Sequence, residues 1–367
     1  MRPCLKPALR RAWRDRTTLQ FGVGPAHSAV LESATAADAA FLDLLDGTRE
    51  LPALTAEAAG LGVDAERVRR LLGELRASDV LDDGEAQRDL LELPPPERAR
   101  LAPDLAALSL AHPEPGAAPA LLLARRRARV EVRGAGRVGA ALAKVLAAAG
   151  VGHVQVVDGG RVQEQDSSPC GLPPQDLGRT RAAAARAAVR QAAPGRPDEE
   201  SACHRTPDLV VLAPRGDAAG LLPDPALSRQ LMRSGTPHLY TGVLETLGTV
   251  GPFVLPGISA CGHCLSLARA DEDPAWPVLL AQHCSGRPAA VAPCDTALAT
   301  TLAGLAALHS LIYLDGGSPP SLGAWAEVSM TDGSVRRRRL EPHPDCGCCW
   351  AADLREAAVS HQHLGGQ

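Results

Sequence analysis

A glycine-rich loop between two apolar strands constrains the fold of this chain more than any other feature. A strand expected at 129–133 runs into Gly134-Ala-Gly136-Arg-Val-Gly139, and a helix rich in Ala and Leu follows. The next strand, expected at 154–157, ends on Asp158. Such glycines permit a tight turn that brings a helix N-terminus close to a phosphate, and an acid after the second strand can bond ribose hydroxyls. This order predicts a mononucleotide- or dinucleotide-binding domain, with a loop that only packs helix on sheet as the alternative.

At 367 residues the chain is long enough for two domains of unequal size. From about residue 121 to 250 strands alternate with helices, which predicts an α/β fold with a doubly wound, mostly parallel sheet. The first part combines short strands with three helices, the last of them capped by Asp64, and predicts a winged-helix-like α+β domain. A stretch rich in Pro and Ala predicts a linker. The predicted domains are 1–88 (winged helix), 89–120 (linker), 121–352 (nucleotide-binding domain) and 353–367 (C-terminal tail).

The overall composition excludes some classes of function. A formal net charge of −4 gives no reason to expect nucleic-acid binding, and the basic runs 125–127 and 336–339 suit solvated turns or edge strands. No apolar run approaches the roughly 20 residues that span a bilayer, and the first residues lack the apolar core of a signal peptide. We therefore expect a cytoplasmic protein with no membrane segment. Ten cysteines in that compartment favour metal ligation or thiol chemistry over structural disulfides.

Two cysteine pairs lie some 80 residues apart, in Cys261-Gly-His-Cys264 and in the run Cys346-Gly-Cys-Cys349. Two such pairs can hold Zn²⁺ in a closed tetrahedron, which would make the site structural; a redox dithiol is the alternative for either pair alone. The predicted ligands are Cys261, Cys264, Cys346 and Cys349. The substitutes for the fourth ligand are His263, His343 and Cys348. The remaining cysteines are expected to be buried bystanders, and they are Cys4, Cys170, Cys203, Cys284 and Cys294.

Taken in order, several segments resemble the ThiF/MoeB/ubiquitin-E1 superfamily. The resemblance covers about residues 121–350 and lies in 134–139, 149–152, 157–158, 176–181, 248–252, 256–257 and the two cysteine pairs. The front domain, with Leu44-Leu-Asp-Gly-Thr48 after its first helix, is similar to the PqqD-like leader-peptide recognition element. Together the two parts resemble the E1-like leader-binding partners of cyclodehydratases in thiazole/oxazole-modified peptide biosynthesis.

This resemblance implies a nucleotide site. Active members bind ATP·Mg²⁺ and adenylate a carboxylate, usually the C-terminal glycine of a protein. The matching residues here are Gly134, Gly136 and Gly139 for the phosphate loop, Asp158 for the ribose, and Arg181 at the position of the family's lysine. The resemblance also implies a homodimer.

The chain departs from the family pattern at three places in that site. Gly160 replaces the second acid of Asp-x-Asp, and the run 166–170 lacks the arginine of Asn-Leu-x-Arg-Gln. Arg215-Gly216 replaces the metal-binding Asp-Asn, although Asp217 lies close by. Because AMP transfer needs cations on the pyrophosphate and a held Mg²⁺, these changes count against efficient adenylation.

Four functional hypotheses follow from these patterns. The first is a protein that captures a precursor leader as an added β-strand beside the 64–77 helix and presents it to a partner cyclodehydratase. The second is an active adenylyltransferase using Asp158, Arg181 and Asp217, with Cys284 as acyl acceptor. The third, a dinucleotide-dependent oxidoreductase, rests on the glycine loop alone. The fourth is DNA binding by the front domain, whose basic helix carries Arg67, Arg69, Arg70 and Arg76.

Overall fold

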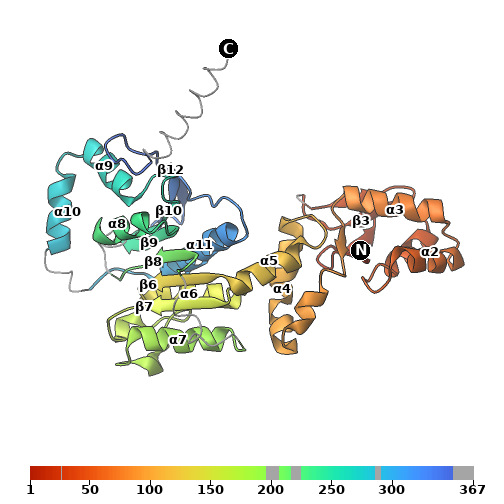
Figure 1. Ribbon diagram of the computed structural model, residues 1–367, viewed down its shortest axis with the longest axis horizontal. Coiled ribbons are helices and arrows are strands. Elements are labelled where there is room, and N and C mark those ends of the chain that lie inside the picture. The colour runs from red at the N-terminus through yellow and green to blue at the C-terminus, as the bar shows by residue number, and fades with distance from the viewer. Residues whose placement is uncertain (26, 196–205, 216–224, 286–290, 350–367) are drawn as a thin grey trace, which may run out of the picture. The chain divides into compact units, whose positions relative to one another are not determined.

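The computed structural model describes all residues except 26, 196–205, 216–224, 286–290 and 350–367. The chain divides into two compact units, Met1–Ala124 and Arg125–Gln367 (Figure 1). The predicted tail and Asp217 lie outside the described residues.

The first unit begins with an α+β module of short strands and three helices. Its antiparallel strands are β1 (Pro3–Leu5) with β5 (Leu81–Asp83), and β2 (Arg11–Trp13), β3 (Leu19–Phe21) and β4 (Ala29–Leu31) in one sheet. Its helices are α1 (Ala36–Asp43), α2 (Leu51–Gly60) and α3 (Ala65–Ala77). The side chain of Asp64 accepts a hydrogen bond from the Arg67 backbone, so the predicted N-cap of α3 is confirmed. Val68, Leu71 and Leu75 form the buried stripe of this helix.

Residues 89–120 differ from the predicted linker. They contain η1 (Arg88–Glu92), α4 (Pro95–Ala111) and most of α5 (Ala117–Arg127). These helices have an apolar core of their own, formed by Leu90, Leu93, Leu101, Leu108, Ala118 and Leu122. Three of the six prolines that suggested a linker, at 94–96, stand at the start of α4, where the first backbone N–H groups have no partner within the helix, so proline begins a helix there rather than preventing one.

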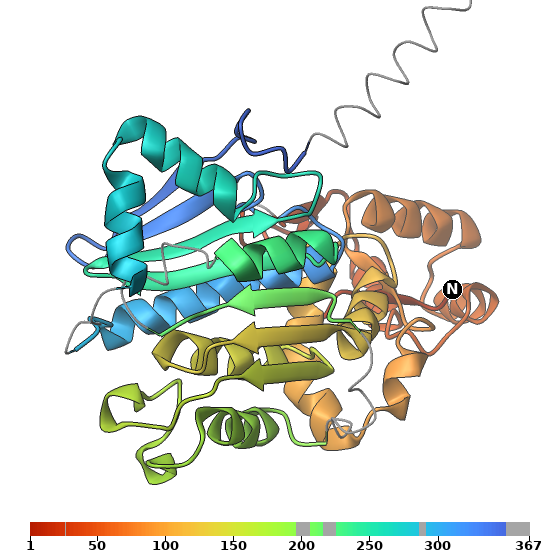
Figure 2. The ribbon, with the colours of Figure 1, turned by 60° about the vertical axis from the view of Figure 1, so that its left-hand side comes forward.

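The second unit is built on a seven-stranded sheet in the order β12-β11-β10-β9-β8-β6-β7 (Figure 2). Its strands are β6 (Arg129–Arg133), β7 (His153–Val157), β8 (Leu209–Leu212), β9 (His238–Leu244), β10 (Leu247–Val254), β11 (Ala324–Ser329) and β12 (Val335–Arg339). The pairs β6–β7, β6–β8 and β8–β9 are parallel, whereas β10, β11 and β12 pair antiparallel with their neighbours. Because β11 runs in the direction of the four parallel strands, the mostly parallel α/β sheet is confirmed.

Helices pack on both faces of this sheet. One apolar core joins the β8 residues Leu209 and Val211 to α6 (Arg137–Ala148), α7 (Arg181–Ala192) and α11 (Thr296–Leu314). A second core joins the alternate residues Val210 and Leu212 to α8 (Pro225–Arg233) and α9 (Gly262–Glu272). Successive side chains of a strand point to opposite faces, so this central strand is covered on both sides.

Two expectations were wrong: that no apolar run is nearly long enough to span a bilayer, and that Arg125 lies in a solvated turn. α11 has 19 residues without a charged side chain and is long and apolar enough to cross a membrane, the one such helix among the described residues. It packs against α6 and the strands β9 and β10, as a core helix does. Arg125, expected in a solvated turn, is buried, and its Nε lies 2.7 Å from Asp315. The basic residues of β12 are exposed at the sheet edge, as predicted.

Candidate functional site

The predicted glycine loop lies between β6 and α6 and touches the end of β8. Gly134 has φ +107°, and a Cβ atom there would lie 2.0 Å from the Ala213 carbonyl oxygen. A Cβ atom on Gly139 would lie 2.0 Å from the Gly134 carbonyl oxygen. Packing alone therefore requires these two glycines. Gly136 differs, because a Cβ atom there would be in ordinary contact, 3.5 Å from the Arg215 side chain.

Asp158 follows β7 as predicted, but its carboxylate is already occupied. The backbone N–H of Ala135 donates to Oδ2 at 2.9 Å and that of Gly160 donates to Oδ1 at 2.7 Å. Nη1 of Arg181 lies 3.1 and 3.3 Å from the two oxygens. A carboxylate offers about four acceptor sites, so no site remains for a ribose hydroxyl in this arrangement. Burial acts to raise the pKa of Asp158, but the two backbone donors and Arg181 outweigh it and hold the pKa below its usual value.

Arg181 lies between two carboxylates. Its Nε donates to Oδ2 of Asp166 at 3.1 Å, while Nη1 binds Asp158. A Cβ atom on Gly160 would lie 2.7 Å from the Arg181 guanidinium carbon. The guanidinium thus occupies the space beside the position where the family has a second acid, and its charge is balanced by buried acids.

Sequence reasoning did not identify the pairing of Asp166 with Arg215. Asp166 is 1% exposed, and its Oδ1 lies 2.6 Å from Nε of Arg215. Nη2 of Arg215 also donates to Oε1 of Gln163 at 2.8 Å. Both residues stand in the segments that depart from the family pattern, and their opposite charges were the signal in the sequence that could have predicted the pair.

A cavity of about 290 Å³ lies at the N-terminus of α6, next to these ion pairs. The acids that line it are Asp166 and Asp295. Asp166 is paired with two arginines, and Asp295 caps α11 through the backbone N–H groups of Ala297 and Leu298. Both cap bonds use Oδ1 of Asp295, so Oδ2 of that residue is the one lining carboxylate oxygen without a hydrogen-bond or ion-pair partner among the described residues. Because Mg²⁺ is usually held by carboxylates together with phosphates, this lining fits ATP·Mg²⁺ poorly as it stands.

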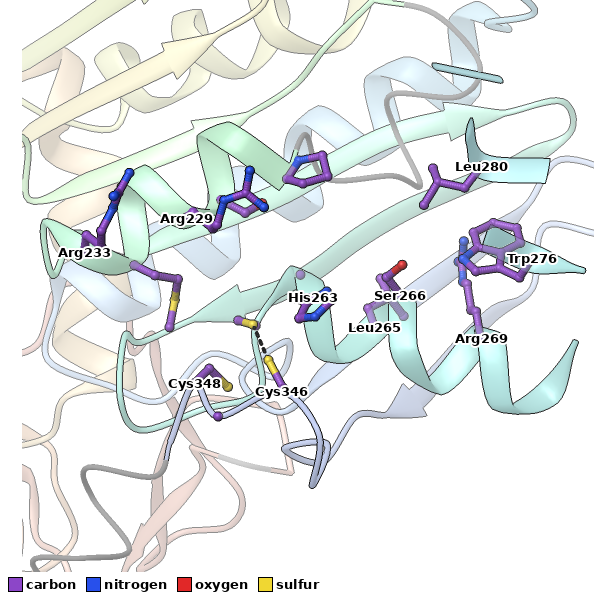
Figure 3. A pocket seen from close by; sticks show the side chains of 16 residues that line it. Arg229, Arg233, His263, Leu265, Ser266, Arg269, Trp276, Leu280, Cys346 and Cys348 are labelled. Atoms are coloured by element: carbon purple, nitrogen blue, oxygen red, sulfur yellow. Dashed lines mark hydrogen bonds between the residues drawn. The ribbon is translucent and has the colours of Figure 1, made fainter. Parts of the chain in front are cut away.

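Four thiols from the two predicted cysteine pairs meet beside α9. The Sγ atom of Cys261 lies 3.9 Å from that of Cys264 and 3.5 Å from that of Cys346, and the Sγ atom of Cys264 lies 3.4 Å from that of Cys348. Figure 3 shows Cys346 and Cys348 side by side at the start of α9. All four sulfurs lie within 4.8 Å of one another. In a tetrahedron with Zn–S bonds of about 2.3 Å the sulfurs are about 3.8 Å apart, so this donor set fits zinc.

The fourth member of this cluster is Cys348, not Cys349. The Cys349 thiol donates instead to the Ser259 carbonyl oxygen at 3.5 Å. The sulfurs of the adjacent residues 348 and 349 lie only 3.6 Å apart, so spacing in the sequence alone could not choose between them. The substitute His343 binds Asp271 through its side chain, and its backbone N–H donates to the Cys264 sulfur at 3.4 Å. Hydrogen bonds from Cys261 and then Cys348 hold the pKa of the Cys264 thiol far below its usual value, which favours the thiolate that metals bind.

The other cysteines do not join this cluster. Burial raises the pKa of Cys4 to about 12, and burial also raises that of Cys294. Cys170 is exposed. Cys203 and the Cys284 side chain, the suggested acyl acceptor, lie outside the described residues.

Comparison with known proteins places the chain in a family. The model of the ThiF family matches residues 115–348. Escherichia coli MccB with ATP is a similar structure, with TM-score 0.66 and 14% identity over 95% of this chain and 100% of that chain. MccB with AMPCPP and MccA has TM-score 0.66 and 14% identity over 95% and 99%. PaaA has TM-score 0.65 and 17% identity over 92% and 99%. No curated protein matches.

At these identities the similar structures establish the fold alone. The family model is a separate finding, and it covers well over half of the chain, including the glycine loop and the cysteine cluster. The chain belongs to the ThiF family.

Proposed function

We propose that this protein binds the leader of a ribosomal precursor peptide and presents it to a partner cyclodehydratase in thiazole/oxazole-type, bacteriocin-like peptide biosynthesis. The observation that carries the proposal is that ion pairs and hydrogen bonds within the protein occupy the side chains of the expected nucleotide site. Asp158 has no acceptor left for a ribose, and Arg215 is paired with Asp166 where the family holds a metal. AMP transfer requires a stabilised pyrophosphate, so a site filled by its own ion pairs favours recognition over catalysis.

The first unit offers a strand edge for the leader. Among the described residues β4 pairs with β3 alone, so its other edge has backbone groups available to an added strand. Val30 of β4 is 42% exposed, while its neighbour Leu31 shares an apolar core with Val68 and Leu71 of α3. MccB, which matches the length of this chain, has been solved with the precursor MccA, and this supports peptide binding here.

Two of the four arginines of α3 have partners inside the unit, which counts against DNA binding by this helix. Arg67 donates to the buried carboxylate of Asp38 and to the Ser33 carbonyl oxygen, and Arg69 donates to Ala65 in its own helix. These two arginines thus have partners inside the unit. A recognition helix needs side chains available to bases and phosphates, so we expect no binding of a DNA duplex even at low salt.

The proposal also includes a structural zinc ion and a homodimer. A Zn²⁺ ion held by four thiolates would be structural and would join the start of α9 to the loop after β12. A homodimer would present two leader sites to the partner enzyme. Light scattering on the purified full chain measures that state directly.

Calorimetry with ATP·Mg²⁺ and an ATP–pyrophosphate exchange assay with the candidate precursor peptide test the closed site. We expect no exchange, and peptide binding that is independent of ATP. Val30→Asp should weaken leader binding at least tenfold. Leu61→Asp, at a 39% exposed position after α2, is the matched control and should leave binding unchanged.

An active adenylyltransferase is the second candidate, and two observations favour it. The chain matches the whole of MccB, which is solved with ATP, and it keeps the glycine loop of the family. Pyrophosphate exchange dependent on the precursor, lost in Asp158→Ala, would replace the first proposal with this one. It would also mean that Arg181 and Arg215 move away when the nucleotide binds.

A further inference from the structure

A second cavity lies apart from the glycine loop, between α8, α9 and α10 (Trp276–Ser285), and has a volume of about 470 Å³. One side of it is formed by the cysteine cluster (Figure 3). The described lining residues include four basic or potentially basic side chains, Arg229, Arg233, Arg269 and His263, and no Asp or Glu. Its apolar lining includes Met232, Leu265, Trp276 and Leu280. This volume suits a ligand of several side chains, and the charge suits an anion.

The α8 wall presents its two arginines together. Arg229 and Arg233 are one helical turn apart and line the cavity with Ser228 and Met232, which places all four on one face of the helix. Neither arginine has an ion-pair or hydrogen-bond partner among the described residues. Like charges at this spacing repel, so an anion between them would stabilise the helix. Figure 3 shows both side chains on the same helix, across the pocket from Trp276.

The opposite wall is aromatic and apolar. The guanidinium of Arg269 lies 4.9 Å from the centre of the Trp276 ring. The indole nitrogen of Trp276 is buried and has no hydrogen-bond partner among the described residues, so the ring offers the cavity an apolar surface. Leu265 and Leu280 line the cavity together with this ring. A charged group bound at α8 would therefore have an apolar surface near it for a neighbouring side chain.

We propose that this cavity binds an acidic, apolar peptide segment, with a carboxylate between Arg229 and Arg233 and an apolar or aromatic side chain against Trp276 and Leu280. A single carboxylate matches two neighbouring guanidinium groups, and a flanking large side chain matches the apolar wall. The inference rests on the proposed function in that the segment would belong to the precursor peptide. The cavity would give the peptide a second contact, which depends on charge, in addition to the strand edge of the first unit.

The test uses the full-length protein and the probe peptide acetyl-Gly-Glu-Leu-Phe-Glu-Gly-amide, followed by calorimetry. We expect the double variant Arg229→Ala/Arg233→Ala, or a probe with Gln in place of both Glu, to lower the affinity at least tenfold. The affinity for the Glu probe should also fall as salt is raised. The matched control is Arg186→Ala/Arg190→Ala, a pair of exposed arginines at the same spacing on α7, which should bind as the unchanged protein does.

Three outcomes would overturn the proposal. The first is that the Gln probe binds as tightly as the Glu probe, and the second is that the α8 double variant binds the Glu probe as the unchanged protein does. The third is that decanoate competes for the site as tightly as the peptide, because the ligand would then be a small apolar carboxylate. The zinc content of each variant shows whether the neighbouring thiols are intact. The proposed function is tested separately, by the loss of leader binding in Val30→Asp and by the absence of pyrophosphate exchange. The proposed function and the peptide-binding cavity can therefore fail independently.

Discussion

The cysteine cluster and the glycine loop lie in the same domain, and they have kept different parts of what the family uses. In the cluster four thiols that could hold a metal lie within 4.8 Å of one another, and three of the sulfur pairs are 3.4–3.9 Å apart. In the loop the backbone shape is present, but the acid that should meet a ribose is bonded to Ala135, Gly160 and Arg181. The cysteine cluster has side chains available to bind a ligand, whereas the glycine loop has the expected main-chain shape but no available acid.

The difference has a physical cause. Gly134 and Gly139 are required because a Cβ atom at either would collide with a backbone oxygen, whatever ligand the loop binds. Their presence is therefore weak evidence of nucleotide binding. Four clustered thiols have no comparable packing role, since they repel as thiolates and leave poor hydrogen bonds as thiols. A metal is what makes that arrangement favourable.

The largest expected effect is the loss of zinc. Cys264→Ser should remove the metal and destabilise the second unit by about 4 kcal/mol or more, because metal binding and folding are coupled in structural zinc sites. For a unit of this size that corresponds to a fall in Tm of about 10 °C. Metal analysis and thermal unfolding measure both quantities.

A matched pair of neighbouring variants sharpens this prediction. Cys348→Ser should release zinc as Cys264→Ser does, whereas Cys349→Ser should retain it, because the Cys349 thiol bonds to Ser259. The reverse result would restore Cys349 as the fourth ligand. Full zinc retention in Cys264→Ser would end the contrast between the two sites.

The next effect separates packing from ligand binding in the glycine loop. Gly134→Ala should cost about 3 kcal/mol, because its φ is +107° and the new Cβ would meet the Ala213 oxygen. Gly136→Ala should cost about 1 kcal/mol or less, since the new methyl group only touches Arg215. Denaturant unfolding gives both values. A large cost at Gly136 would show that the loop is tighter than its geometry indicates.

A smaller effect is expected from the ion pairs that close the nucleotide site. Asp158→Asn should cost about 2 kcal/mol at neutral pH, because an amide N–H would face the donors of Ala135, Gly160 or Arg181. The pKa of Asp158 is lower in the folded chain than in the unfolded one. Its contribution is thus present above pH about 4 and lost as pH falls through the folded pKa.

Unfolding curves between neutral and acid pH test this sign. The unchanged protein should lose stability below about pH 4, and Asp158→Asn should lose less over the same range. Equal acid slopes in the two proteins would mean that Asp158 is not paired as described.

The sequence predicted those features that depend on periodicity and on covalent spacing. The α/β sheet, the strand–loop–helix around Gly136 and the meeting of the two cysteine pairs follow from alternating patterns and from glycine and cysteine spacing. What it missed depends on side-chain direction. The choice of Cys348 over Cys349 and the pairing of Asp166 with Arg215 are set by rotamers and loop paths. The helices in 89–120 were missed because proline was interpreted as a breaker rather than as a first-turn residue.

The smallest expected effect concerns Arg215, which stands where the family binds a metal. Arg215→Ala should cost about 1 kcal/mol, because the guanidinium is partly exposed and Arg181 still balances Asp166. Arg215→Asp would place a second carboxylate beside Asp166 and should destabilise the protein more, unless a divalent cation binds between them. We expect millimolar Mg²⁺ to raise the Tm of Arg215→Asp and not that of Arg215→Ala or of Arg161→Asp, a nearby exposed control. If Mg²⁺ raised the Tm of the unchanged protein as well, the nucleotide site would hold a metal despite its ion pairs, and its contrast with the cysteine cluster would disappear.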